Sequence, residues 1–79
     1  MTESQIQAKI IKRYEADGWF ALKIIRCNKN GFPDIIFLKD GKAELVEVKK
    51  PKVGRLSKVQ EYRIKELAKY GFEVLILNE

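Results

Sequence analysis

The dipeptide Asp40-Gly41 lies between two segments rich in apolar and β-branched residues, 34–39 and 42–49. Asp-Gly is a strong signal for a two-residue β-hairpin loop, because such loops need positive φ at both positions. A two-residue loop also sets the register, so that residues whose numbers add up to 81 face each other. The sequence therefore predicts a hairpin in which Asp34 lies opposite Glu47 and Lys49 follows on the same face.

Capping boxes predict the starts of two helices. Thr2 with Gln5 and Ser57 with Gln60 have the required spacing, and Gly18 and Gly71 end the helical patterns. The expected order is a helix at about 3–16, strands at 19–26, 34–39 and 42–49, a helix from 58 to about 70, and a strand at 72–77. The second helix would connect the third strand to a parallel fourth strand. We expect one domain, residues 1–79, of the α/β class with a mixed four-stranded sheet flanked by helices.

The predicted opposition of two carboxylates is unfavourable unless something offsets their charge. At ~4 Å and an effective dielectric constant of ~20, two like charges repel by ~4 kcal/mol. A divalent cation between Asp34 and Glu47 reverses the sign, and oxygen ligands favour Mg²⁺ or Mn²⁺ over zinc. The chain has no histidine and one cysteine, Cys27, which excludes histidine catalysis and cysteine-cluster metal sites. The alternative is that Asp34 only begins a strand after Pro33, while Glu47 pairs with Lys49.

Two further polar residues continue apolar helix faces. Glu3 lies on one face with Gln7, Ile10 and Tyr14, and Gln60 shares a face with Ile64 and Leu67. Both helix starts could therefore direct an oxygen atom at the strand ends that carry the two acids. The alternatives are that Glu3 only complements the helix dipole and that Gln60 only closes its capping box.

The excess positive charge lies in residues 49–58, KKPKVGRLSK, which hold five basic residues and no acidic one. The net charge of the whole chain is also +5, so the remainder is neutral. A cationic patch on a neutral body attracts phosphates, although a solvated loop is the alternative. No apolar run approaches the ~20 residues of a membrane span, and the first residues are unlike a signal peptide. Together with the unpaired thiol of Cys27, interpreted as an inert small residue, this favours the cytoplasm.

The acidic residues stand in a recognisable pattern. Gly31-Phe32-Pro33-Asp34, followed after twelve residues by Glu47-Val48-Lys49, resembles the PD-(D/E)xK nuclease signature. The segment 50–60, KPKVGRLSKVQ, narrows the resemblance to the virus-type replication-repair nuclease domain, VRR-NUC, in the stand-alone form of phages and other viruses. This resemblance covers nearly the whole chain. It implies a restriction-endonuclease-like αβββαβ core and metal-dependent cleavage of DNA.

The resemblance also implies roles for individual residues. Asp34 and Glu47 would bind Mg²⁺ or Mn²⁺ together with the Val48 carbonyl, and Lys49 would orient or deprotonate the attacking water. Glu3 and Gln60 would correspond to the helix-one acid and the helix-two glutamine of related nucleases. The DNA backbone on either side would be held by the basic residues of the tail, namely Lys50, Lys52, Arg55 and Lys58.

Two functions remain open from the sequence. The first is a structure-specific endonuclease for branched DNA such as a Holliday junction, acting as a homodimer whose two sites match the symmetry of the junction. Its interface candidates are aromatic residues expected to be exposed, namely Trp19, Phe20 or Tyr70, and the alternative for each of them is packing in the core. The second is a non-catalytic nucleic-acid-binding module that uses loop 49–58 and stacks bases on Trp19, Phe32 or Tyr62.

Overall fold

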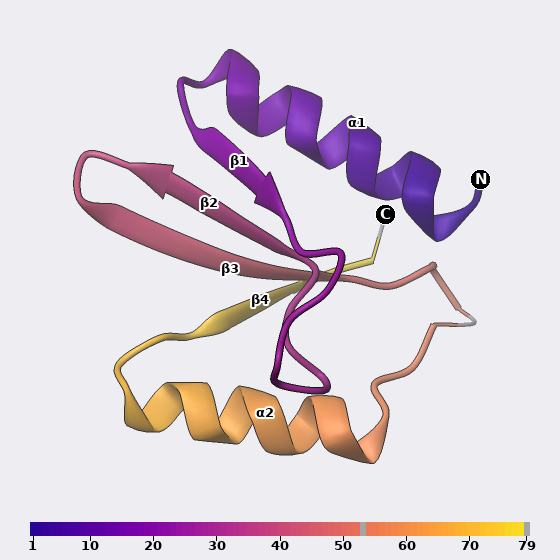
Figure 1. Cartoon of the computed structure of the whole chain (residues 1–79). Helices are drawn as coiled ribbons and strands as arrows, with labels where there is room; N and C mark the ends of the chain where they lie inside the picture. Colours follow the sequence, from indigo (N-terminus) through magenta and orange to yellow (C-terminus); the bar gives the residue numbers. More distant parts are fainter. Residues whose placement is uncertain (53, 79) are drawn as a thin grey trace.

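The computed structural model describes residues 1–52 and 54–78. The elements are α1 (Glu3–Ala16), β1 (Phe20–Lys23), β2 (Ile35–Lys39), β3 (Lys42–Val48), α2 (Lys58–Lys69) and β4 (Val74–Leu77). The strands form one sheet in the order β1-β2-β3-β4, antiparallel except for the parallel pair β3–β4. The two helices cover opposite faces of the sheet (Figure 1). The predicted α/β class, element order and mixed sheet are therefore confirmed.

The hairpin has the register that its turn demands. The pairs run from Lys39 opposite Lys42 to Ile35 opposite Val46, so every pair adds up to 81. Asp40 and Gly41 have φ values of 50° and 75°, as the two-residue turn requires.

The first strand is shorter than the predicted 19–26 and ends at Lys23. Its last ladder partner is Ile35, and one further bond runs from the Ile24 amide to the Asp34 carbonyl at 2.8 Å. Pro33, which precedes Asp34, lacks an N–H and cannot extend a ladder. The pairing therefore stops here and residues 24–34 form a loop.

The core lies between the sheet and α1. Its buried residues are Ile6, Ile10, Ile35, Phe37, Val46 and Val48. The Tyr14 ring stacks on Phe37 with 3.7 Å between ring centroids. Both predicted capping boxes are present, with the hydroxyls of Thr2 and Ser57 accepting from the amides of Gln5 and Gln60.

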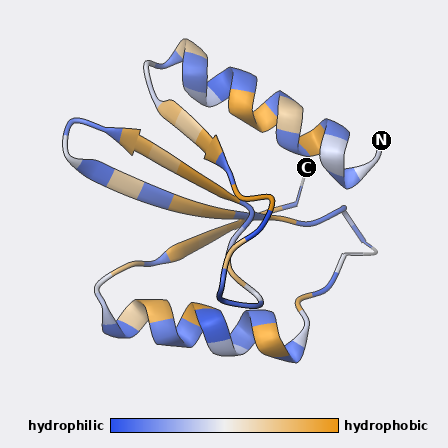
Figure 2. Cartoon of the chain, viewed as in Figure 1, coloured by the Kyte–Doolittle hydropathy of each residue, from blue (hydrophilic) through white to orange (hydrophobic). Residues whose placement is uncertain are grey.

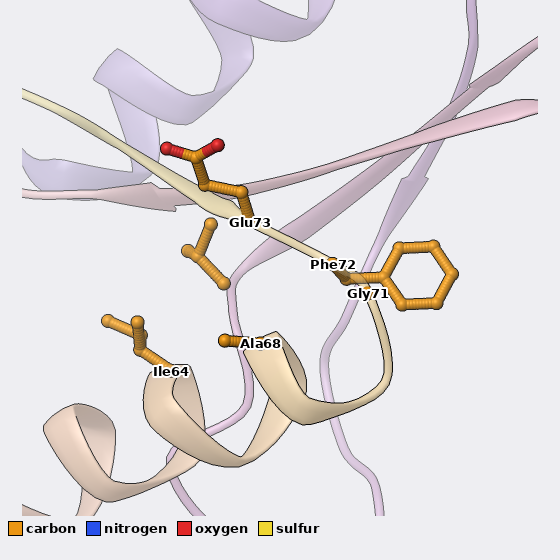
Figure 3. Close-up of a pocket in the computed structure, with 6 residues that line it drawn as sticks. Ile64, Ala68, Gly71, Phe72 and Glu73 are labelled. Atoms are coloured by element: carbon orange, nitrogen blue, oxygen red, sulfur yellow. The ribbon is translucent and has the colours of Figure 1, made fainter.

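The face that carries α2 is packed more loosely. No residue of α2 is fully buried. An open pocket of about 510 Å³ lies between the second half of α2 and the start of β4, and its lining includes Ile64, Ala68 and Val74. Figure 3 shows the Ile64 and Ala68 side chains that line it from α2. Apolar residues are concentrated in the strands (Figure 2), and part of this face remains uncovered.

Several elements begin or end at the same end of the sheet. There β1 ends, β2 begins and β3 ends, and both helices begin at the same end (Figure 1). Within the described residues, neither helix is both long and apolar enough to cross a membrane.

Candidate active site

Asp34 and Glu47 meet at this end of the sheet. Asp34 directly precedes β2, Glu47 is the second-last residue of β3, and the hairpin register carried one pair further places them opposite each other. The Val48 amide donates to Asp34 Oδ2 at 2.9 Å, which holds the aspartate against β3. The predicted opposition of the two acids is therefore confirmed.

The Glu47 carboxyl is deeply buried, with 2% of the residue exposed. Burial and, next, the nearby negative charge of Asp34 together raise its pKa to about 7, against the opposing effect of Lys49. A buried carboxylate beside a second carboxylate is a site where a cation is favourable.

Lys49 and Gln60 complete a connected set of polar contacts. Lys49 Nζ lies 3.3 Å from Glu47 Oε2 and donates to Gln60 Oε1 at 3.0 Å. Gln60 Nε2 donates to Glu47 Oε2 at 3.1 Å. Lys49, expected within a basic stretch, is itself only 9% exposed. The lysine is therefore held inside the site rather than at the surface.

Gln60 also caps α2. Its side-chain Oε1 accepts from the Ser57 backbone amide at 2.9 Å in addition to Lys49, and its own backbone amide donates to Ser57 Oγ at 3.2 Å. The Gln60 side chain reaches the end of β3 as predicted, but the atom that meets Glu47 is Nε2, whereas the oxygen faces Lys49 and Ser57. The glutamine closes its capping box as well. The start of α2 is thus linked directly to the position of the Lys49 amine.

Pro33 leaves the Val48 carbonyl without a ladder donor. The Lys49 amide donates to Leu77 in β4, so the N–H and C=O of Val48, one residue earlier, point toward the β2 side. The residue opposite Val48 in the register is Pro33, which has no N–H to donate. The carbonyl oxygen expected as a metal ligand therefore receives no bond from the residue that faces it.

Two glycines make close approaches that no side chain would allow. A Cβ on Gly31 would lie 2.7 Å from the carbonyl oxygen of Val59, in the first turn of α2, and the φ of Gly31 is 76°. A Cβ on Gly54 would lie 2.6 Å from the Lys50 amide and 2.9 Å from Lys49 Cβ. Gly31 therefore sets the distance between the loop before Asp34 and α2, and Gly54 allows the chain to fold back against Lys49.

Glu3 is not joined to these residues. It is half-buried, and within residues 1–52 and 54–78 no hydrogen bond or ion pair connects it to Asp34 or Glu47, nor does any group of three acidic, histidine or cysteine side chains gather. The reason is strand alternation, since Glu47 points to the α2 face and α1 packs on the other. The helix face predicted to continue from Glu3 is nevertheless buried further along α1, at Gln7 and Ile10.

The remaining predicted residues divide by exposure. All four tail residues proposed to hold DNA are exposed, namely Lys50, Lys52, Arg55 and Lys58; Val53, within the same stretch, lies outside the described residues. Phe20 and Tyr70 are exposed, whereas Trp19 follows the alternative of core packing. Trp19 is half-buried, because its ring packs edge-on against Tyr14 with centroids 5.8 Å apart. Phe32 is half-buried, and Tyr62 is exposed.

Sequence reasoning missed the positioning contacts. The link from Ser57 through Gln60 to Lys49, the contact of Gly31 with α2, and the bond from Arg63 Nε to the Asn30 carbonyl at 2.9 Å were not anticipated. Gly31 stood inside the recognised motif, which was a usable signal. Nothing local marked Arg63, whose partner lies 33 positions earlier in the chain.

The chain was compared with models of known protein families, and one family model matches it. The family model described as the VRR-NUC domain matches residues 1–78, essentially the whole chain. A search of curated proteins gives no match. The chain therefore belongs to the VRR-NUC family of nuclease domains.

Proposed function

We propose that this protein is a metal-dependent DNA endonuclease whose active site is formed by Asp34, Glu47 and Lys49. The observation that carries the proposal is the buried Glu47 carboxyl, set against Asp34 and beside a buried lysine. Burying the Glu47 carboxylate next to the half-buried Asp34 is unfavourable for the fold unless a cation is bound there. Membership of a nuclease family supports cleavage over the alternative of a binding module.

The donor set fits Mg²⁺ or Mn²⁺. Asp34 and Glu47 supply carboxylate oxygens, and the Val48 carbonyl, which Pro33 cannot engage, supplies a third oxygen. Mg²⁺ keeps several waters and is usually held by one or two carboxylates together with substrate phosphate, so a larger acidic cluster is not required. When bound, such an ion would polarise a phosphoryl oxygen and lower the pKa of a coordinated water.

The side chains of the protein supply position and charge. Lys49 brings a positive charge to the buried site, where it offsets charge on the phosphate and orients the attacking water. Gln60 holds the Lys49 amine from one side and the Glu47 carboxyl from the other, at 3.0 Å and 3.1 Å. The role of Glu3 stays a prediction from the resemblance alone.

The tail residues would hold DNA beside this site. Lys50, Lys52, Arg55 and Lys58 lie between the end of β3 and the first turn of α2, directly after Lys49. The fold-back at Gly54, whose amide donates to the Lys50 carbonyl at 2.9 Å, keeps this cationic segment next to the active site. Contacts of this kind bind the backbone and carry no base sequence.

We further propose a homodimer that acts on branched DNA. A single site cuts one strand, whereas two sites related by a two-fold axis match the symmetry of a four-way junction. The uncovered part of the α2 face supports association, since Phe20, Leu22 and Leu38 share that face and are 63%, 44% and 41% exposed. The free, exposed thiol of Cys27 is in keeping with action in the reducing cytoplasm.

A cleavage panel tests the proposal. Purified protein would be incubated with plasmid, linear, flap and four-way-junction DNA in Mg²⁺, in Mn²⁺ and in excess EDTA. We expect cleavage only with metal, most strongly on the junction, and loss of cleavage in Asp34→Ala, Glu47→Ala and Lys49→Ala. The exposed Glu73→Gln serves as the control. Full activity in EDTA would overturn the metal mechanism, and DNA binding without cleavage in any metal would favour the binding module. Sedimentation at micromolar concentration tests the dimer separately.

A further inference from the structure

A second group of cations lies at the end of β1 and on the loop that joins β1 to β2. Residues 18–33 contain Lys23, Arg26 and Lys29 and no acidic residue. Together with 49–58, this segment holds eight of the sixteen basic residues and none of the eleven acidic ones. The rest of the chain is therefore net negative, and the net positive charge is confined to these two segments.

Both segments border the active site. One leads into Asp34 and the other leads out of Lys49, and they lie at the same end of the sheet (Figure 1). The Asp34–Glu47 pair thus has a cationic loop before it and another after it. A nucleic-acid backbone passing over the two acids would need positive charge on each side, because the acids themselves repel it.

The loop is held in place by contacts within the fold. The Asn30 carbonyl accepts from Arg63 Nε, Gly31 lies against the first turn of α2, and the Cys27 thiol donates to the Lys29 carbonyl at 3.3 Å. Arg63 is itself paired with Glu66, whose charge also acts on Lys29. Among the described residues, the structure gives no acidic neighbour for Arg26, the other cation of this loop. The contacts hold the loop backbone in place, while its cationic side chains are exposed.

Ile25, next to Arg26, is 81% exposed. This large apolar side chain is exposed to solvent and lies in the sequence between two cations, Lys23 and Arg26. It also lines an open pocket of about 270 Å³, together with Arg26, Asn30 and Phe32. Apolar residues that flank cations on DNA-binding surfaces are used as wedges, which unstack a base step and kink the duplex.

We propose that loop 24–32 is a second DNA-binding surface, in which Arg26 and Lys29 bind backbone phosphates and Ile25 enters the base stack. It engages the arm of the DNA on the opposite side of the scissile phosphate from the segment 50–58. This inference rests on the proposed nuclease function and extends it, because a wedge favours substrates whose stacking is already interrupted, as at a branch point.

The electrostatic part is tested by binding without cleavage. Junction DNA would be titrated in EDTA over a range of salt concentrations, with every protein in the Glu47→Gln background. We expect Arg26→Ala/Lys29→Ala to reduce the log–log salt slope by ~1–2, at ~0.9 per lost phosphate contact. The matched double variant Lys12→Ala/Lys42→Ala removes the same charge from exposed positions and should leave the slope unchanged. Equal slopes for the two double variants would overturn the inference.

The positions of the two surfaces are tested by hydroxyl-radical footprinting of the same complexes. Arg26→Ala/Lys29→Ala should lose protection on one side of the cut, and Lys52→Ala/Arg55→Ala on the other. Loss on the same side for both would refute the two-sided arrangement. If the Glu47→Gln protein with both surfaces intact bound no DNA at all, that result would instead count against the proposed function. The two failures are therefore distinct.

The wedge is tested with 2-aminopurine placed at the base step beside the cut. Its fluorescence should rise on binding of protein with Ile25 or Ile25→Met, because both side chains are long and apolar. Ile25→Ser should bind without the rise. A rise of the same size with Ile25→Ser would show that Ile25 does not enter the stack.

Discussion

The buried Glu47 makes the stability of the metal-free protein depend on pH in a defined direction. Its pKa is raised from 4.5 to about 7 in the folded protein, chiefly by burial and then by the charge of Asp34. Between these values the folded state binds more protons than the unfolded state does. The free energy of unfolding therefore falls as the pH rises through this window, and it levels off above about pH 7.

The size of the effect follows from the two pKa values. A shift from 4.5 to about 7 corresponds to about 3 kcal/mol, at ~1.4 kcal/mol per pH unit. That is a large share of the ~5–15 kcal/mol by which a typical domain is stable. Glutamine carries no charge, so we expect Glu47→Gln to remove this destabilisation. At pH 8 the variant should therefore be more stable than the wild type by up to about 3 kcal/mol.

Urea unfolding in EDTA between pH 4.5 and 8 measures the effect, with the fluorescence of Trp19, the single tryptophan, as the signal. Glu73→Gln removes an exposed carboxylate and should follow the wild-type pH curve. The difference between wild type and Glu47→Gln is the quantity of interest. If that difference does not change with pH, or if the wild type gains on the variant as the pH rises, the argument from burial is wrong.

Three further predictions concern positions around the site. Ser57→Ala and the matched Thr2→Ala should each cost about 1 kcal/mol of unfolding free energy through the lost helix cap, but only Ser57→Ala should lower kcat, with Ser57→Thr restoring it; equal kcat values would show that the cap does not position Lys49. By calorimetry, Asp34→Asn should be at least as stable as wild type without metal and should lose the rise in Tm on adding Mg²⁺; an equal rise in both would place the ion elsewhere. Gly31→Ala should destabilise the fold more than Gly41→Ala in urea, because both glycines have φ near 75° and only Gly31 lies against α2; equal losses would mean that the contact is unimportant.

Features that depend on a few neighbouring residues could be predicted from local sequence alone. Asp40-Gly41 defined both the hairpin and its register, since a two-residue loop leaves no freedom in pairing. The two capping boxes located the helix starts, because their bonds span only three residues. From these the opposition of Asp34 and Glu47 could be predicted before the fold was known.

The contacts between elements depend on the packing of the whole fold and could not be predicted from local sequence. The helix starts of Glu3 and Gln60 had equivalent patterns, yet only Gln60 contacts Glu47, because strand alternation turns Glu47 toward α2. The burial of Lys49, the contact of Gly31 with Val59 and the inward packing of Trp19 depend likewise on elements far apart in the chain. Local patterns set the shape of each element, whereas the distances between elements are set by the packing of the whole chain, which no short segment encodes.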